Sequence, residues 1–157
     1  MATRRRIIGV LGGMGDDERA RAVGGAIAEA GCLLACGGGL GVMESAARGA
    51  REAGGDVIGI LPGTDPEWAN EYVNIPIATG LGEARNCVLA TCSDAVVCLG
   101  SGPGTLSEVA FALKLGRPVY AIRSGWDGIP GVVVLADVGA LRGVLSATRG
   151  GGGGGAE

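Results

Sequence analysis

Short apolar runs alternate with amphipathic segments along most of the chain. The apolar runs have no polar face, which is typical of central strands that helices cover on both sides. The predicted strands are residues 7–11, 32–35, 56–61, 73–77, 94–99, 119–122 and 132–135. Apolar residues at helical spacing predict helices over residues 18–30, 42–53, 81–92, 105–115 and 137–148. This alternation predicts an α/β fold of βαβ units with a mostly parallel central sheet.

Two segments depart from the alternation. Residues 62–72 contain two prolines, Trp68 and Asn70, and we interpret them either as a cover over a strand edge or ligand cleft, or as a surface loop. Residues 150–157 form a glycine-rich tail, which is predicted to be disordered because polyglycine loses much entropy on ordering and buries nothing. With 47% hydrophobic residues among 157, residues 1–149 are predicted to form one domain.

Glycine-rich turns follow three of the predicted strands. The first is Gly9-x-x-Gly12-Gly13-x-Gly15, the second runs from Gly37 to Glu44, and the third from Gly100 to Glu108. The last two each open a helix, whose first amides lack an internal partner and favour negative charge. We therefore expect a phosphate ligand shared by the turns, with contacts from Gly12, Gly13, Gly37, Gly38, Gly39, Gly41, Ser101, Gly102, Gly104 and Thr105.

Composition excludes several kinds of site. The net charge is −3 and the basic cluster is confined to residues 4–6, so a polymeric nucleic acid is not an expected partner. The chain has no histidine and no Cys-x-x-Cys pair among its five cysteines, so no metal site is expected. No apolar run is long enough to cross a bilayer. These features predict a soluble cytoplasmic protein without a membrane partner.

Two familiar nucleotide motifs are absent. The first glycine turn is not Gly-x-Gly-x-x-Gly, and the second strand ends in Ala35 and Cys36 where an acidic ribose ligand is expected in NAD-binding proteins. A Walker loop is missing as well. The first turn is therefore interpreted as a tight turn that lines the same cleft.

Three charged side chains near the turns have two interpretations each. The spacing of Thr105 and Glu108 fits a capping box, in which the two residues bond each other's free amides, but Glu108 is equally placed to act on a ligand. Arg85 is either a surface arginine or a ligand contact. Glu44 either matches the helix dipole or contacts the ligand. Lys114 lies late in its helix, away from the strand ends, so a pyridoxal Schiff base is not expected.

Together the motifs resemble the LOG-like superfamily. They are the turn from Gly37 to Glu44, residues 57–63, residues 79–86 and Gly102-Pro-Gly-Thr-Leu-Ser-Glu108, and the resemblance covers residues 7–122. The superfamily includes cytokinin riboside 5′-monophosphate phosphoribohydrolases, proteins once labelled lysine decarboxylases, and molybdenum cofactor carrier proteins. It implies a Rossmann-like three-layer sandwich, a homodimer or tetramer, no required cofactor, and a phosphorylated nucleotide-like ligand at the strand tips. The position of Lys114 argues against the decarboxylase label.

In the phosphoribohydrolases the catalytic pair is an arginine and a glutamate, which match Arg85 and Glu108 by position. The implied reaction hydrolyses the N-glycosidic bond of a nucleoside 5′-monophosphate to the base and ribose 5-phosphate. Glu108 would stabilise oxocarbenium charge or activate water. Further ligand contacts are expected from Met43, Glu44 and Asn86.

The sequence also departs from the enzymes. Residues 82–86 lack the methionine and lysine of the enzyme motif, the third turn lacks its leading proline, and the first turn is one residue shorter. At these places the chain is closer to the molybdenum cofactor carriers, which bind a phosphorylated pterin without transforming it. The leading hypothesis is a phosphate-binding protein that cleaves a nucleotide, and the alternative is a non-catalytic carrier of the molybdenum cofactor.

Overall fold

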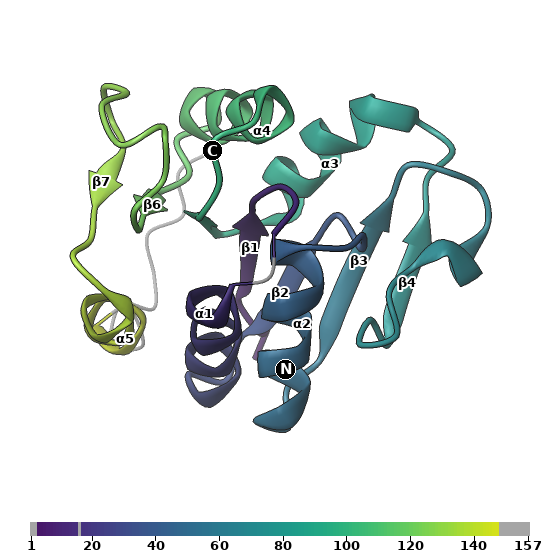
Figure 1. Ribbon diagram of the computed structural model, residues 1–157, viewed down its shortest axis with the longest axis horizontal. Coiled ribbons are helices and arrows are strands. Elements are labelled where there is room, and N and C mark those ends of the chain that lie inside the picture. The colour runs from purple at the N-terminus through teal and green to yellow at the C-terminus, as the bar shows by residue number, and fades with distance from the viewer. Residues whose placement is uncertain (1–2, 16, 148–157) are drawn as a thin grey trace.

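Seven parallel strands form one central sheet (Figure 1). The computed structural model describes residues 3–15 and 17–147. The strands are β1 (Ile7–Leu11), β2 (Leu33–Cys36), β3 (Val57–Leu61), β4 (Ile75–Ala78), β5 (Ala95–Cys98), β6 (Val119–Ala121) and β7 (Val133–Val134). Their order in the sheet is β4-β3-β2-β1-β5-β6-β7, and every neighbouring pair is parallel. The predicted strands therefore agree with the structure to within about two residues.

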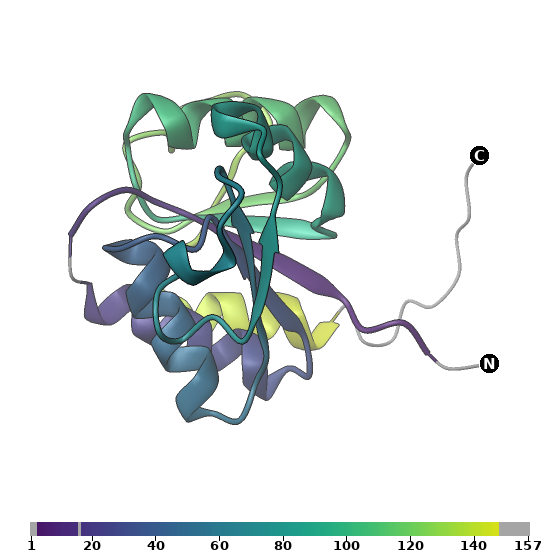
Figure 2. The same cartoon turned by 90° about the vertical axis from the view of Figure 1, so that its right-hand side faces the viewer.

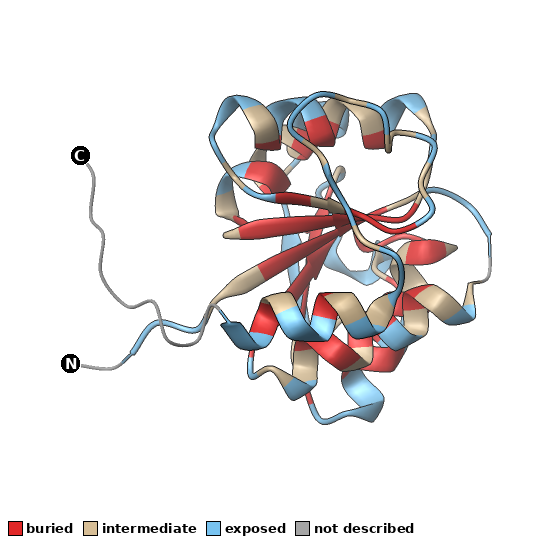
Figure 3. Cartoon of the chain, turned by 90° about the vertical axis from the view of Figure 1, so that its left-hand side faces the viewer, coloured by how far each residue is buried: buried red, intermediate tan, exposed pale blue. Residues whose placement is uncertain are grey.

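Helices cover both faces of the sheet, as Figures 2 and 3 show. They are α1 (Glu18–Glu29), α2 (Val42–Glu52), α3 (Arg85–Cys92), α4 (Pro103–Lys114) and α5 (Val138–Ala147), with short 3₁₀ turns η1 (Pro66–Trp68) and η2 (Gly82–Ala84). One core cluster joins the sheet to α1, α2 and α5, and a second joins it to α3 and α4. The prediction of a Rossmann-like three-layer sandwich is confirmed.

Two local expectations need adjustment. The helix expected from residue 81 begins at Arg85, after η2. The strand expected over 73–77 is β4, an edge strand with all four residues exposed; an edge position accommodates Pro76, which has no N–H to donate. At the start of α1, Asp17 is the N-cap and accepts the Arg19 N–H at 2.9 Å. The predicted glycine-rich tail, residues 150–157, lies outside the described residues.

The order of the strands defines where a ligand can bind. The chain builds the sheet outward from β1 to β4 and then returns to β5 on the other side of β1. Such a switch point leaves a crevice outside the carboxyl ends of the strands. The loops after β1 and β5 meet here, since a Cβ added to Gly100 would lie 2.8 Å from the Gly12 Cα. Glycine at this contact allows the two loops to approach closely.

Candidate functional site

A cleft of about 450 Å³ lies at the carboxyl ends of the strands, within the usual range for small-molecule sites. Of the residues expected at the site, nine line it: Gly12, Gly13, Met43, Arg85, Asn86, Gly102, Gly104, Thr105 and Glu108. Four further residues complete the lining: Pro62, Trp68, Gly82 and Glu83. The structure thus brings the two expected catalytic residues to the same cleft.

The start of α4 opens into this cleft. Gly102 is the N-cap, Pro103 is the first helical residue, and no side chain caps the helix. The first backbone bond of the helix is donated by the Leu106 N–H to the Gly102 carbonyl at 3.0 Å. The amides of Gly104 and Thr105 precede this bond, so they are free to donate to an anion. Added Cβ atoms at Gly102 and Gly104 would meet nothing within 4 Å, which leaves room for the ligand.

The capping-box interpretation of Thr105 and Glu108 is wrong. Thr105 is the third residue of α4 rather than its cap, and no side-chain hydrogen bond closes the helix start. The reason is Pro103, whose fixed φ favours the first helical position and moves the helix start upstream. Glu108 therefore lies one turn into the helix, where its side chain is not needed to complete the backbone hydrogen bonding.

The carboxyl group of Glu108 is buried at the bottom of the cleft. Among the described residues it has no hydrogen-bond partner, and the charge that acts on its pKa is the guanidinium of Arg85. Burial raises the pKa of Glu108 to about 7, an effect that Arg85 partly offsets. At neutral pH this group therefore exists in both protonation states, which suits either proton transfer or contact with a phosphate.

Arg85 is held by backbone carbonyls below the cleft. One terminal amino group donates to the Gly37 carbonyl at 2.6 Å and to the Ile60 carbonyl at 2.7 Å. Its Nε is buried and has no partner among the described residues. Arg85 lines the same cleft as the free α4 amides of Gly104 and Thr105, and a cation together with free amides fits an anionic ligand.

Asn86 supports the start of α4 from the neighbouring helix. Its side-chain amide donates to the Ser107 hydroxyl at 3.0 Å, and this hydroxyl donates to the Gly104 carbonyl at 2.6 Å. The chain of bonds fixes the first turn of α4 relative to α3. Asn86 thus lines the cleft and also positions the amides that point into it.

Trp68, from the segment that the sequence predicts to be either a cover over the cleft or a surface loop, lines the cleft. It is 56% exposed and forms an apolar wall of the cleft with Met43 and Pro62. Its segment is tied down because Asn70 donates its backbone N–H to the Gly38 carbonyl and its side-chain amide to the Gly39 carbonyl, both at 2.8 Å. In the sequence, the only signal was that Trp68 and Asn70 lie in an irregular segment. This signal did not distinguish a segment that covers the cleft from a surface loop.

The remaining expected residues lie outside the cleft. Gly37, Gly38 and Gly39 do not line it. Ser101 lines a neighbouring hollow together with Gly13 and Gly102. Gly41 and Glu44 line a further hollow on the side of α1 and α2.

The sequence predicts neither a metal site nor a membrane-spanning segment, and the structure of the described residues addresses both predictions. No group of three or more His, Cys, Asp or Glu side chains that could hold a metal ion occurs within residues 3–15 and 17–147. Within the same ranges, no helix is long and apolar enough to cross a membrane.

Comparisons with known proteins identify one family that matches the chain, and several similar proteins and solved structures. The SLOG cluster4 family model matches residues 5–147. An uncharacterized protein from Archaeoglobus fulgidus is 45% identical over 120 residues, which cover 74% of this chain and 79% of that protein. A probable cytokinin riboside 5′-monophosphate phosphoribohydrolase from Oryza sativa is 41% identical over 79 residues, but these cover only 49% of this chain and 35% of that protein.

The similar solved structures span nearly the whole chain. The molybdenum cofactor binding protein from Rippkaea orientalis has a TM-score of 0.86 and 34% identity, and the match covers 94% of this chain and 99% of that one. The molybdenum cofactor carrier protein from Chlamydomonas reinhardtii has a TM-score of 0.83 and 37% identity, and the match covers 94% and 100%. These proteins share the fold over nearly the whole chain.

Proposed function

Because the chain belongs to the SLOG cluster4 family, within the LOG-like superfamily, we propose that it binds a phosphorylated pterin, the molybdenum cofactor, as cargo. The observation that carries this proposal is the uncapped start of α4, which opens into a cleft with an apolar wall. The two solved relatives named above as binding or carrying this cofactor match 94% of the chain. The match to the phosphoribohydrolase covers half of it.

The described residues fit such a ligand at both of its ends. The free amides of Gly104 and Thr105, at the positive end of the α4 dipole, suit the phosphate. The apolar faces of Trp68 and Met43 suit a flat heterocycle. Glu108, with a pKa raised to about 7 by burial, is protonated in a large fraction of molecules at neutral pH, which reduces its repulsion of a phosphate.

Retention of the cofactor tests the proposal. The protein is incubated without oxygen with cofactor released from a molybdenum enzyme and then passed through a gel-filtration column. The bound cofactor is oxidised to its fluorescent pterin and counted per chain. Wild type is expected to retain the cofactor. Gly104→Asp is expected to retain at least about tenfold less cofactor per chain, because a carboxylate in the first turn suits the helix dipole but repels phosphate.

Gly128→Asp is the matched control. Gly128 is exposed and an added Cβ there meets nothing within 4 Å, so the same charge is added away from the cleft. Failure of wild type to retain cofactor, or equal retention by Gly104→Asp and wild type, would overturn the proposal.

Hydrolysis of nucleoside 5′-monophosphates is the second candidate function. It is favoured by Glu108, which is buried beside Arg85 and is not used as a helix cap. In this reaction water adds to C1′ of the ribose, the N-glycosidic bond breaks, and the base leaves with a proton. The ionised Glu108 would stabilise the oxocarbenium charge or accept the proton of the attacking water.

A panel of nucleoside 5′-monophosphates decides between the candidates. The enzyme hypothesis expects free base and ribose 5-phosphate, a rate that rises as the pH passes about 7, and loss of release in Glu108→Gln. Absence of release from every nucleotide, or release that Glu108→Gln does not change, removes this candidate and leaves the carrier.

The homodimer or tetramer implied by the family stays a proposal. It is supported by Phe111 and Leu115, two apolar side chains four residues apart that are 37% and 44% exposed on and just after α4. Such a surface suits a second copy of the chain. Light scattering of wild type and of Phe111→Glu should show an oligomer and its dissociation, and a monomeric wild type would contradict the proposal.

A further inference from the structure

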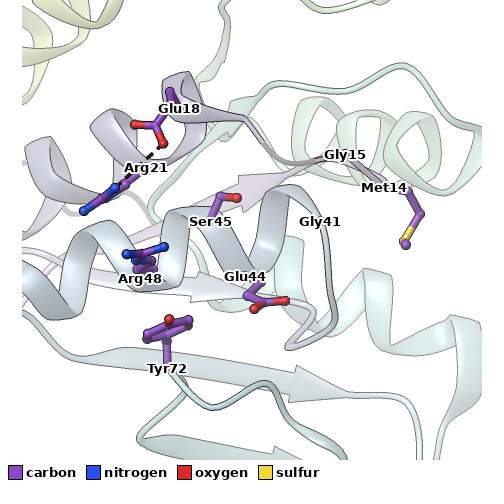
Figure 4. Close-up of a pocket in the computed structure, with 9 residues that line it drawn as sticks. All are labelled: Met14, Gly15, Glu18, Arg21, Gly41, Glu44, Ser45, Arg48 and Tyr72. Atoms are coloured by element: carbon purple, nitrogen blue, oxygen red, sulfur yellow. Dashed lines mark ion pairs between the residues drawn. The ribbon is translucent and has the colours of Figure 1, made fainter.

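A second polar hollow lies beside α1 and α2 (Figure 4). It encloses about 330 Å³ and is lined by Met14, Gly15, Glu18, Arg21, Gly41, Glu44, Ser45, Arg48 and Tyr72. None of these residues lines the cleft. Between their linings, the Val42 N–H at the start of α2 donates to the Gly13 carbonyl at 3.0 Å. The hollow is therefore a separate site, and its ligand does not depend on the function proposed for the cleft.

Two opposite charges on α2 face this hollow without pairing. Glu44 and Arg48 are four residues apart, in the order that normally favours an ion pair on a helix. Arg48 instead donates its Nε to Glu52 at 2.8 Å. Its terminal amino groups have no partner within the described residues, and neither has the Glu44 carboxylate. Figure 4 shows both side chains at the same hollow.

Tyr72 supplies an aromatic surface beside these charges. Its ring lies next to the Arg48 side chain in Figure 4 and packs partly against the core. Its backbone N–H donates to the side-chain oxygen of Asn70 at 3.0 Å, and Asn70 is buried and bonded to the Gly39 carbonyl. The backbone of Tyr72 is thus anchored, and its ring can stack on a flat ligand.

Glu44, Arg48 and Tyr72 together fit one pattern of hydrogen bonding, while Glu18 and Arg21 of the same hollow pair with each other at 3.7 Å. A free carboxylate accepts two N–H bonds, a guanidinium donates to an oxygen, and the phenol ring stacks. A heterocyclic ligand that matches these groups presents a carbonyl, a ring N–H and an exocyclic amine side by side along one edge. We infer that the hollow binds a 2-amino-4-oxo-pyrimidine ring, the unit shared by guanine and pterins, with Glu44 on the N–H groups and Arg48 on the oxygen. Adenine lacks this edge, and hypoxanthine and lumazine lack the amine.

Binding of phosphate-free ligands tests the inference, because they lack the group expected to bind in the cleft. Equilibrium dialysis compares guanosine with inosine and adenosine, and pterin with lumazine. Guanosine or pterin is expected to bind at least about tenfold more tightly than its analogue without the amine. A larger preference for guanosine points to a nucleotide as the natural source, and a larger preference for pterin points to a pterin. Equal binding of every ring overturns the inference.

Variants locate the binding in the hollow. Glu44→Gln should lose about tenfold in affinity for the preferred ring, because one acceptor becomes a donor. Tyr72→Ala should weaken binding, while Tyr72→Phe, which keeps the stacking surface, should not. Glu67→Gln, at an exposed carboxylate outside the hollow, is the control. Melting temperatures confirm that each variant is folded, and a Glu44→Gln protein that is folded and binds like Glu67→Gln contradicts the assignment.

One more variant separates this site from the cleft. Gly104→Asp should leave guanosine and pterin binding unchanged while it removes retention of the phosphorylated cofactor. Loss of both in Gly104→Asp would place the ring in the cleft and overturn the inference, without affecting the proposal of phosphate binding by α4.

Discussion

Two turns with similar sequences have different surroundings in this molecule. In the turn after β2, the carbonyls of Gly37, Gly38 and Gly39 accept hydrogen bonds from Arg85 and Asn70. In the turn after β5, Gly102 and Gly104 face open space, and the amides at the start of α4 are free. The first turn therefore holds protein groups in place, and the second leaves its donors to a ligand.

The difference shows that glycine serves distinct purposes in the two turns. Gly38 has a φ of +78°, and a Cβ added there would lie 2.3 Å from the Leu61 Cδ2, so glycine is needed for the backbone shape and for packing. Gly104 lies in a helix and has no such neighbour. The two turns thus differ in role: the turn after β2 positions Arg85 and the segment of Trp68 around the cleft, and the turn after β5 is the one that we propose binds the anion. This division can be tested by substitutions in each turn.

Arg85→Ala should have the largest effect on stability. It removes two hydrogen bonds from a charged group to the Gly37 and Ile60 carbonyls, and we expect the free energy of unfolding to fall by about 4 kcal/mol. Chemical denaturation measures the change. Arg5→Ala is the matched control, since its ion pair with Asp56 is exposed and contributes at most about 1 kcal/mol. Equal losses in the two variants would show that Arg85 does not anchor the first turn.

Gly38→Ala should destabilise the protein by about 3 kcal/mol. The alanine must adopt a left-handed backbone and its Cβ meets Leu61, and each effect costs about 1 to 3 kcal/mol. The expected result is a lower midpoint in urea with an unchanged slope. If Gly38→Ala keeps the wild-type midpoint, the packing role of this turn is wrong.

Glu108→Gln should stabilise the protein at high pH. The pKa of Glu108 is raised from 4.5 to about 7 in the folded state, so the stability that the protonated group provides is full below about pH 4.5 and is lost as the pH rises through 7. At pH 8 the variant should gain up to about 3 kcal/mol, at about 1.4 kcal/mol per pH unit. Melts of both proteins at pH 5 and pH 8 measure this, and a pH-independent difference would contradict the burial of an ionisable group.

Gly104→Ala should have the smallest effect on stability, a gain of less than about 1 kcal/mol, because alanine is favoured over glycine in a helix. Its Cβ points into open space, so it should weaken phosphate binding without unfolding the turn. A loss of stability as large as that of Gly38→Ala would show that the two turns are alike.

The alternation of apolar runs and helical segments was enough to predict the sheet and its layers, because parallel strands covered on both faces leave a strong pattern. The cleft at the strand ends followed from the same topology. The roles of the two turns could not be predicted, since both consist of glycines after a strand, and the difference lies in Asn70 and Arg85, which reach the first turn from distant segments.

At the start of α4, two local sequence patterns predict different first residues of the helix. The spacing of Thr105 and Glu108 fits a capping box, but Pro103 determines where α4 begins. Trp68 lies at the cleft in a segment that Asn70 ties to the turn after β2, and no local pattern reveals this contact between distant segments.

Amide chemical shifts measured during titration with ribose 5-phosphate test most directly whether the turn after β5 holds the phosphate. In spectra of the ¹⁵N-labelled protein, the amides of Gly104 and Thr105 are expected to shift downfield and saturate, while those of Gly37, Gly38 and Gly39 stay in place. Saturable shifts of the Gly37 to Gly39 amides, with Gly104 and Thr105 unchanged, would contradict the division between the two turns and the proposed binding site.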